Sequence, residues 1–217
     1  MFEHAHFSVE NRPIEIHAFG SGPKTTLIMA GVHGDEQDGV DVVRAVLSSL
    51  SATPVNTLEG QRIVVMTCAN PDGYAANTRQ NANGIDINRN FPDKTFGTGK
   101  KSKKFNAGKI AASEPETKAI LGVVAHFKPS LIISLHEALA CVNYNGPCIR
   151  LARRISKATG LPAVGDVGYP TPGSMGNYFG FDKRLPVITL ELPKEKVDSA
   201  SYANALLRVV GIPIHNS

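Results

Sequence analysis

The stretch Gly31-Val32-His33-Gly34-Asp35-Glu36-Gln37-Asp38-Gly39 joins two contrasting patterns in this 217-residue sequence. Before it stands an apolar run, Thr26-Leu27-Ile28-Met29-Ala30, which is typical of a buried strand. After it, apolar residues recur at helical spacings of three, four and three, at Val40, Val43, Leu47 and Leu50. We therefore expect a central strand that ends at a glycine-rich turn, with a helix directly behind the turn.

His33 and Glu36 lie on this turn, three residues apart. On a helical turn, positions i and i+3 project to the same side, so an imidazole and a carboxylate can converge on one point. Imidazole nitrogens and carboxylate oxygens are both common zinc ligands. A single histidine after a strand is more often a hydrogen-bonded structural residue, so the metal hypothesis depends on further ligands elsewhere in the chain.

Short apolar strands alternate with helical patterns along the rest of the chain. Strands are predicted at residues 14–19, 25–30, 62–68, 131–135 and 187–190. Helices are predicted at about residues 33–50, 113–128, 148–159 and 199–210. This alternation predicts one three-layer α/β domain over residues 1–217, with a central mixed, largely parallel sheet and helices on both faces.

Two local patterns predict how segments begin, and between them lies a long irregular stretch. Pro71-Asp72-Gly73 predicts a turn in which the glycine has a positive φ. Ser113 with Glu116 three residues later predicts a capping box, with Pro115 in the first helical turn. The sequence in between is polar, glycine-rich and aperiodic to about Ala112, and a compact domain seldom keeps such a segment without a function.

Polar residues stand at the ends of three predicted strands: His33, His136 and Glu191. In open α/β sheets, ligands bind outside the carboxyl ends of the strands, so these side chains are expected at one edge. With Glu36 they supply two histidines and a glutamate for zinc, plus a free carboxylate. Glu137 follows His136 directly, and both a supporting role in the site and a role as a capping or solvated acid remain open for it.

The irregular segment also holds Arg79, Asn88 and Arg89. Arginine presents a planar fork that suits carboxylates, so these residues can form an anion clamp on a pocket wall. A solvated loop is the alternative.

Charge and composition limit the classes of partner. Net charge is +4, yet residues 94–109 carry six lysines and no acid, which is typical of either a solvated mobile loop or a rim that attracts anionic substrates. Aromatic residues make up 6% and no binding motif accompanies the lysines, so we expect no nucleic-acid partner. No apolar run is long enough to span a membrane, and we expect no membrane partner.

The three cysteines and an N-terminus unlike a signal peptide predict a cytoplasmic protein. The oligomeric state stays open, and a homo-oligomer is one possibility.

Taken together, the motifs resemble the zinc metallocarboxypeptidase family. They occur in the family's order as Gly-Val-His-Gly-Asp-Glu (31–36), Asn-Pro-Asp-Gly-Tyr (70–74), Thr-Arg (78–79), Gly-Ile-Asp-Ile-Asn-Arg-Asn-Phe-Pro (84–92), Ser-Glu-Pro-Glu-Thr (113–117), Ser-Leu-His (134–136) and Thr-Leu-Glu-Leu-Pro (189–193). The set spans about residues 30–193, and jointly it is highly specific. The resemblance implies a zinc carboxypeptidase-like fold and one Zn²⁺ per chain.

The resemblance also implies roles for individual residues. His33, Glu36 and His136 match the family's zinc ligands, and Glu191 matches its general base. Arg79 matches the arginine that stabilises the oxyanion. Asn88 and Arg89 match the pair that holds the substrate's terminal carboxylate, and Tyr169 stands near the position of the family's mobile tyrosine. No aspartate stands near Met175, where family members that select basic side chains tend to carry one.

Residues 134–141 and 168–174 are similar to segments of bacterial members that act on murein peptides. This implies hydrolysis of the γ-D-glutamyl–meso-diaminopimelate amide in murein tripeptide (L-Ala-γ-D-Glu-meso-Dap), which releases diaminopimelate in peptidoglycan recycling. Three alternatives remain: a general carboxypeptidase, a zinc N-acyl amino acid deacylase of the desuccinylase or aspartoacylase kind, and a non-catalytic binding protein. The segments 70–74 and 113–117 favour the carboxypeptidase over the deacylase, and the full set of site residues disfavours the binding protein.

Overall fold

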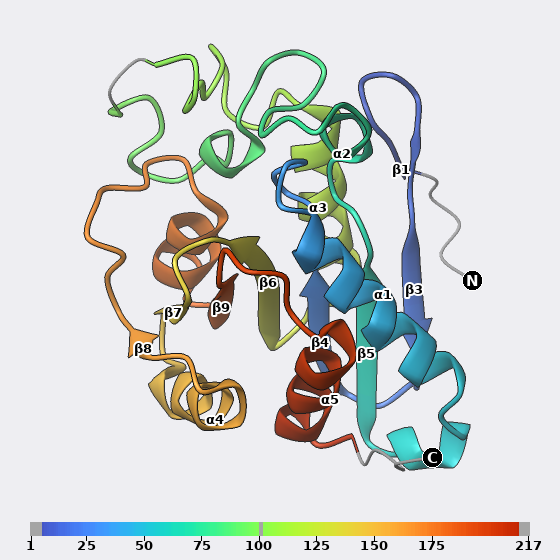
Figure 1. The fold of residues 1–217 in the computed structure, drawn as a ribbon. Coiled ribbons are helices and arrows are strands. Elements are labelled where there is room, and N and C mark those ends of the chain that lie inside the picture. The colour runs from blue at the N-terminus through green and yellow to red at the C-terminus, as the bar shows by residue number, and fades with distance from the viewer. Residues whose placement is uncertain (1–5, 100–101, 213–217) are drawn as a thin grey trace.

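The computed structural model describes residues 6–99 and 102–212, and its central feature is a mixed seven-stranded sheet (Figure 1). The strands lie in the order β3 (Ile16–Phe19), β5 (Gln61–Met66), β4 (Lys24–Met29), β6 (Leu131–Glu137), β9 (Val187–Leu192), β7 (Cys141–Asn145), β8 (Ala163–Val164). The four strands from β5 to β9 run parallel, while β3 and β7 pair antiparallel with their neighbours β5 and β9. The expected mixed, largely parallel sheet is confirmed.

Helices cover both faces of this sheet. One face carries α1 (Gln37–Ser51), α4 (Ile149–Thr159) and α5 (Ser199–Val210), and Figure 1 shows α1 and α5 side by side. The other face carries α3 (Pro115–Phe127) and the π-helix η3 (Gly176–Asp182). The remaining elements are the strand pair β1 (His6–Phe7) and β2 (Pro13–Ile14), the helix α2 (Pro71–Ala76), and the 3₁₀ turns η1 (Val55–Leu58) and η2 (Ile87–Arg89).

The three layers follow from the two-residue period of the strands. In β4, Ile28 belongs to the core under α1 and α5, while its neighbours Leu27 and Met29 belong to the core under α3. In β6, Ile133 belongs to the core under α1 and α5, and Ile132 belongs to the core under α3. Successive side chains of a strand point to opposite faces, so a near-continuous apolar run supplies both cores at once. Each such buried aliphatic side chain stabilises the fold by about 1.5–3 kcal/mol.

The turn at residues 33–36 differs from the expectation in one respect. His33 and Glu36 precede α1, which begins at Gln37, and they are linked by a backbone hydrogen bond of 3.4 Å from Glu36 N to His33 O. They therefore share a tight turn before the helix, as expected, and the helix itself begins at Gln37, later than the predicted start directly after His33. The turn still brings both side chains to the same side.

The expected turn at Pro71-Asp72-Gly73 is instead the first turn of α2. The side chain of Asn70 accepts a hydrogen bond from Gly73 N at 2.9 Å, and Pro71 occupies the first helical position, where its missing N–H costs nothing. Gly73 is required for space rather than for a positive φ, because a Cβ at this position would overlap the side chain of Asn70 and the carbonyl of Gln80.

The predicted capping box at Ser113 was also wrong, although Pro115 does start α3. Ser113 Oγ donates to Glu114 Oε1 at 2.6 Å, and Glu114 occupies the N-cap position. Glu116 accepts hydrogen bonds from Val9 N at 3.1 Å and from the Asn81 side chain at 2.9 Å. Partners from distant parts of the chain have replaced the local cap.

Among the elements that were not predicted are β7, β8 and η3. β7 carries the polar residues Asn143 and Asn145, so its apolar signal is interrupted, and β8 has only two residues. None of the helices formed by the described residues combines the length and apolar character needed to cross a membrane.

Candidate metal centre and active site

The side chains predicted from three separate strand ends do meet at one edge of the sheet. His33 follows β4, while His136 and Glu191 lie near the ends of β6 and β9 and are paired in register. The described parts of the irregular segment, residues 77–99 and 102–114, pass over this edge (Figure 1). The fold therefore supplies an open edge for the chemistry and a loop layer that covers it.

His33, Glu36 and His136 form a compact, buried group of possible metal ligands. Glu36 places its two carboxylate oxygens 2.7 Å from His33 Nδ1 and 2.8 Å from His136 Nδ1. The two Nδ1 atoms face each other at 3.2 Å. Ligand atoms about 2.0–2.1 Å from a tetrahedral zinc ion lie roughly 3.4 Å apart, so this arrangement of two nitrogens and a carboxylate fits zinc.

The carboxylates of Glu36 and Asp86 make this site attractive to positive charge, whether a proton on His33 or a metal ion in its place. Burial lowers the pKa of His33, but Glu36 and Asp86 raise it by more, and the result is a pKa of about 9. Burial raises the pKa of Glu36, but His33 and His136 lower it by more, so its pKa lies below the ordinary range of a carboxylic acid. Glu36 is therefore ionised at neutral pH, as a carboxylate ligand must be.

Asp86 is a member of the site that sequence reasoning missed. It is fully buried, and its Oδ1 lies 3.1 Å from His33 Nε2 while its Oδ2 accepts a hydrogen bond from Arg79 Nε at 2.9 Å. A carboxylate on Nε2 holds the proton there and leaves Nδ1 free for a metal. The signal was present in the quoted segment 84–92, where Asp86 stands two residues before Asn88.

The environment of Asp86 keeps it ionised. Burial raises its pKa, but His33 and then Arg79 and Arg89 lower it by more, and the result is a pKa of about 2. Asp86 thus links the turn that carries His33 to the segment that carries Arg79.

Glu191 lies beside the ligand group without belonging to it. It is buried, and its Oε2 has no hydrogen-bond partner among the described residues. Burial is the largest cause that raises its pKa and Glu36 raises it further, although His136 and His33 act in the opposite direction. A carboxyl group with a raised pKa next to a metal centre is suited to taking up and returning a proton.

Arg79, Asn88 and Arg89 line the same region. Arg79 Nη1 lies 3.7 Å from Glu36 Oε1, next to the ligand group. Arg89 is buried and donates from Nη1 to Asn88 O at 2.7 Å. Asn88 Oδ1 accepts a hydrogen bond from Met175 N at 2.9 Å, which leaves the amide NH₂ group of Asn88 to donate elsewhere. The segment thus presents several donors, as expected of an anion clamp.

Tyr169 stands in a loop and is 46% exposed. Partial burial and then the charge of Glu191 raise its pKa, while Arg89 and Arg79 lower it. Its hydroxyl therefore lies within electrostatic reach of both the arginines and Glu191. Glu137, in contrast, accepts a hydrogen bond from Gly39 N at 3.0 Å, so it caps the N-terminus of α1.

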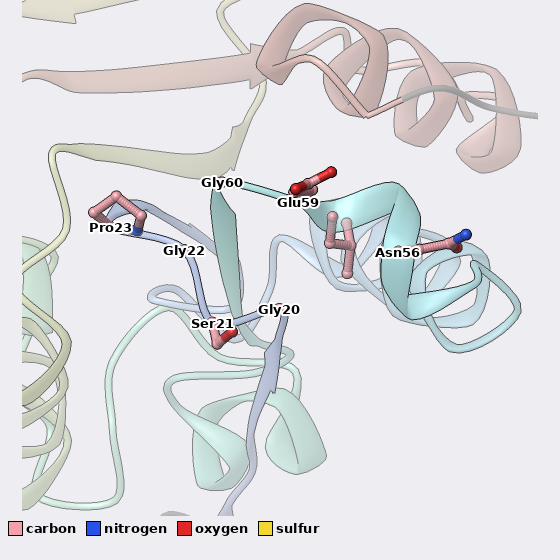
Figure 2. Close-up of a pocket in the computed structure, with 8 residues that line it drawn as sticks. Gly20, Ser21, Gly22, Pro23, Asn56, Glu59 and Gly60 are labelled. Atoms are coloured by element: carbon pink, nitrogen blue, oxygen red, sulfur yellow. The ribbon is translucent and has the colours of Figure 1, made fainter.

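A cavity of about 470 Å³ lies elsewhere, at the amino ends of β4 and β5 (Figure 2). Gly20, Ser21, Gly22, Pro23 and Gly60 form much of its lining. These residues precede the strands whose opposite ends lead to the metal group, and Glu59 is the one titratable side chain that lines the cavity. The cavity therefore has no part in the site described above.

Comparison with known families identifies the family of this chain. The model of the zinc carboxypeptidase family matches residues 2–148. The chain belongs to the zinc carboxypeptidase family. It is therefore a peptidase-type hydrolase with one zinc ion per chain, and His33, Glu36 and His136 are the group able to hold that ion.

Among members of the zinc carboxypeptidase family, the chain is similar to murein peptide amidase A of Escherichia coli (strain K12), with 36% identity over 186 residues that cover 81% of this chain and 74% of the relative. Murein peptide amidase A of Vibrio campbellii is 35% identical over 183 residues, which cover 79% of this chain and 71% of the relative.

Solved structures give the same picture of the fold. The murein-tripeptide amidase of Escherichia coli O157 superposes with a TM-score of 0.77 and 30% identity, covering 99% of this chain and 92% of that one. Carboxypeptidase A of Helicoverpa armigera also reaches a TM-score of 0.77, with 19% identity and coverage of 95% and 66%. The expected zinc carboxypeptidase-like fold is confirmed.

Proposed function

We propose that this zinc carboxypeptidase hydrolyses the γ-D-glutamyl–meso-diaminopimelate amide of murein tripeptide and releases diaminopimelate in peptidoglycan recycling. Relatives that match most of the chain bear the names murein peptide amidase A and murein-tripeptide amidase. The observation that carries the proposal is the buried His33–Glu36–His136 group, with Glu191 beside it and an arginine pair next to it.

In this proposal His33 and His136 would hold the metal through Nδ1 and Glu36 through its carboxylate. A zinc ion held there would supply a Lewis acid and would lower the pKa of water to about 7. Glu191 takes the proton from the attacking water and later delivers it to the leaving amine. Water adds across the amide C–N bond, so its oxygen joins the γ-glutamyl carbonyl carbon while the diaminopimelate nitrogen leaves as an amine.

Arg79 stabilises the oxygen that becomes negative in the tetrahedral transition state. Its position supports this role, since Nη1 lies 3.7 Å from Glu36 Oε1 and Nε is held by Asp86 at 2.9 Å. Loss of one such donor typically lowers the rate by about 10²–10³. Asp86 therefore orients a ligand and the oxyanion donor together.

Asn88 and Arg89 bind the carboxylate of the leaving residue. In meso-diaminopimelate this carboxylate sits at the L centre, next to the scissile amide, and the D centre adds an amine and a second carboxylate for selectivity. Tyr169 contacts the substrate from its exposed loop, where its hydroxyl senses the charges of Glu191, Arg89 and Arg79. The substrate is a small anionic peptide, which a positively charged rim would attract.

The experiment compares three substrates on zinc-loaded protein: murein tripeptide, a C-terminal dipeptide and N-succinylglutamate. Release of diaminopimelate from the tripeptide, abolished by a chelator and restored by zinc, supports the proposal. Preferential cleavage of the dipeptide would establish a general carboxypeptidase, and preferential cleavage of N-succinylglutamate would establish a deacylase. Absence of turnover with all three, while zinc remains bound, would favour a binding protein.

We further propose that residues 1–217 form a single catalytic domain that acts in the cytoplasm. The three cysteines, Cys68, Cys141 and Cys148, are free thiols, which is typical of a reducing compartment. Fractionation of cells that produce the protein tests the location, with release of diaminopimelate from murein tripeptide assayed in each fraction.

A further inference from the structure

The lysine-rich segment 94–109 places one aromatic ring against both arginines of the site. The guanidinium carbon of Arg79 lies 5.2 Å from the centroid of the Phe105 ring, and that of Arg89 lies 5.1 Å from it. Lys104 Nζ lies 5.5 Å from the same centroid. A cation within about 6 Å of an aromatic centroid is attracted by the negative face of the ring.

Phe105 is held in place on both sides by hydrogen bonds to the segment that follows Arg79. Gln80 Nε2 donates to Lys103 O at 3.1 Å and to Lys104 O at 2.8 Å. On the other side, Asp86 N donates to Asn106 O at 2.8 Å, and the Asn106 side chain donates to Gly84 O at 2.8 Å. The described part of the segment is therefore fixed to the site; Lys100 and Lys101 lie outside the described residues.

The positive charges of Arg79 and Arg89 repel each other, so a contact that attracts both guanidinium groups stabilises their placement. Asp86 and Glu36 neutralise part of this charge: Asp86 bonds directly to Arg79 at 2.9 Å, and Glu36 Oε1 lies 3.7 Å from Arg79 Nη1. Arg89 donates a hydrogen bond to the backbone carbonyl of Asn88, which carries no charge. The face of Phe105 gives each guanidinium a second attractive contact that does not occupy its hydrogen-bond donors.

We propose that Phe105 is a positioning residue of this hydrolase, which holds Arg79 and Arg89 side by side with their donors free for substrate. The proposal rests on the oxyanion and carboxylate roles given to these arginines above. Through Arg79 the ring acts on the transition state, and through Arg89 it acts on binding of the leaving residue. Loss of the aromatic face therefore lowers kcat and raises KM at the same time.

The test replaces Phe105 by Leu, which keeps an apolar side chain of similar size, and by Trp, which keeps the aromatic face. We expect Phe105→Leu to lower kcat/KM for murein tripeptide about tenfold, divided between kcat and KM, and Phe105→Trp to stay within about twofold of the unmodified protein. Phe7→Leu is the matched control, because Phe7 is 43% exposed against 38% for Phe105 and lies in β1. The proposal is overturned if Phe105→Trp loses as much activity as Phe105→Leu, or if neither variant loses any.

A second readout does not depend on activity. In zinc-loaded protein labelled with ¹⁵N-arginine, the Nε–H signals of Arg79 and Arg89 are assigned with Arg79→Lys and Arg89→Lys. Loss of the Phe105 ring removes its ring-current effect, so we expect the chemical shifts of both signals to change in Phe105→Leu and to stay the same in Phe7→Leu. Unmoved arginine signals overturn the positioning role. Moved signals in a protein without murein tripeptide turnover would instead uphold the contact and reject the proposed substrate.

Discussion

His136 in β6 and Glu191 in β9 occupy paired positions in neighbouring parallel strands. Side chains of a strand alternate between the two faces, so paired residues of adjacent strands project to the same side of the sheet. A slip of one residue in this register would send one of the two to the opposite face. The distance between a metal ligand and the proposed base is therefore set by the strand pairing, which the apolar residues of both strands stabilise from within the core.

Glu191→Gln is expected to lower kcat by about 10²–10⁴ while zinc remains bound, because Glu191 moves a proton and is not a member of the ligand group. Diaminopimelate release and the zinc content per chain are measured on the same sample. The exposed Glu195→Gln, four residues further along, serves as the control and keeps full activity. Loss of zinc in Glu191→Gln would reassign the residue to the metal.

Asp86→Ala is expected to weaken zinc binding by about 10–100-fold, because His33 loses the carboxylate that fixes its tautomer. The same change frees Arg79, so kcat falls even at saturating zinc. Competition with a chromophoric chelator gives the affinity. The exposed Asp166→Ala is the control; equal zinc affinities in the two variants would rule out the link to His33.

Asp72→Asn is expected to lower the free energy of unfolding at pH 7 by about 1–2 kcal/mol. Asp72 accepts hydrogen bonds from Ser8 Oγ, Glu10 N and Arg12, which tie the N-terminal residues to α2. Burial raises its pKa, but the Glu10 N–H, the Ser8 hydroxyl and Arg12 lower it by more. A lowered pKa gives stability that is present above the ordinary value of about 3.9 and is lost as the pH falls through the folded value.

The difference between the unmodified protein and Asp72→Asn should therefore shrink as the pH falls below about 4. Urea unfolding at pH 7, 5 and 3 measures it. A difference that stays constant over this range would show that the charge of Asp72 contributes nothing.

Replacing Lys103 and Lys104 together by Gln is expected to lower kcat/KM a few-fold at low salt and to reduce its dependence on ionic strength. Both lysines are exposed and directly precede Phe105 in the sequence, close to the proposed anion clamp. The control replaces Lys24 and Lys157, which are also exposed but lie at the start of β4 and in α4. If the two double variants respond to salt alike, the rim does not steer the substrate.

The sequence predicted the central strands well because their apolar runs are decided by burial on both faces. β4, β6 and β9 are of this kind, and their expected positions agree with the structure to within about two residues. β7 was missed because Asn143 and Asn145 interrupt its apolar run, and Asn143 donates to Val164 O of the neighbouring β8. The cap at Ser113 was wrong because Asn81 and Val9, distant in sequence, compete for the same glutamates.

The site was predicted from residue types at strand ends, and its ligand group did converge. Asp86 was missed because its partners, His33 and Arg79, become its neighbours only when the loop folds over the sheet. Phe105 was missed for the same reason, since a lysine-rich, glycine-rich segment has no periodicity that points an aromatic ring at anything. Site residues at the ends of regular strands can be predicted from the local sequence pattern. Contacts between two irregular segments cannot, because no periodicity in the sequence indicates them.

The proposed mechanism requires one zinc ion held by His33, Glu36 and His136, residues that are up to 103 positions apart in the chain. Anomalous diffraction at the zinc edge from crystals of the zinc-loaded protein tests this most directly. We predict one strong peak between His33 Nδ1, His136 Nδ1 and the Glu36 carboxylate, lost in His136→Ala and retained in the exposed His126→Ala. A peak elsewhere, or one that survives His136→Ala unchanged, would contradict the account.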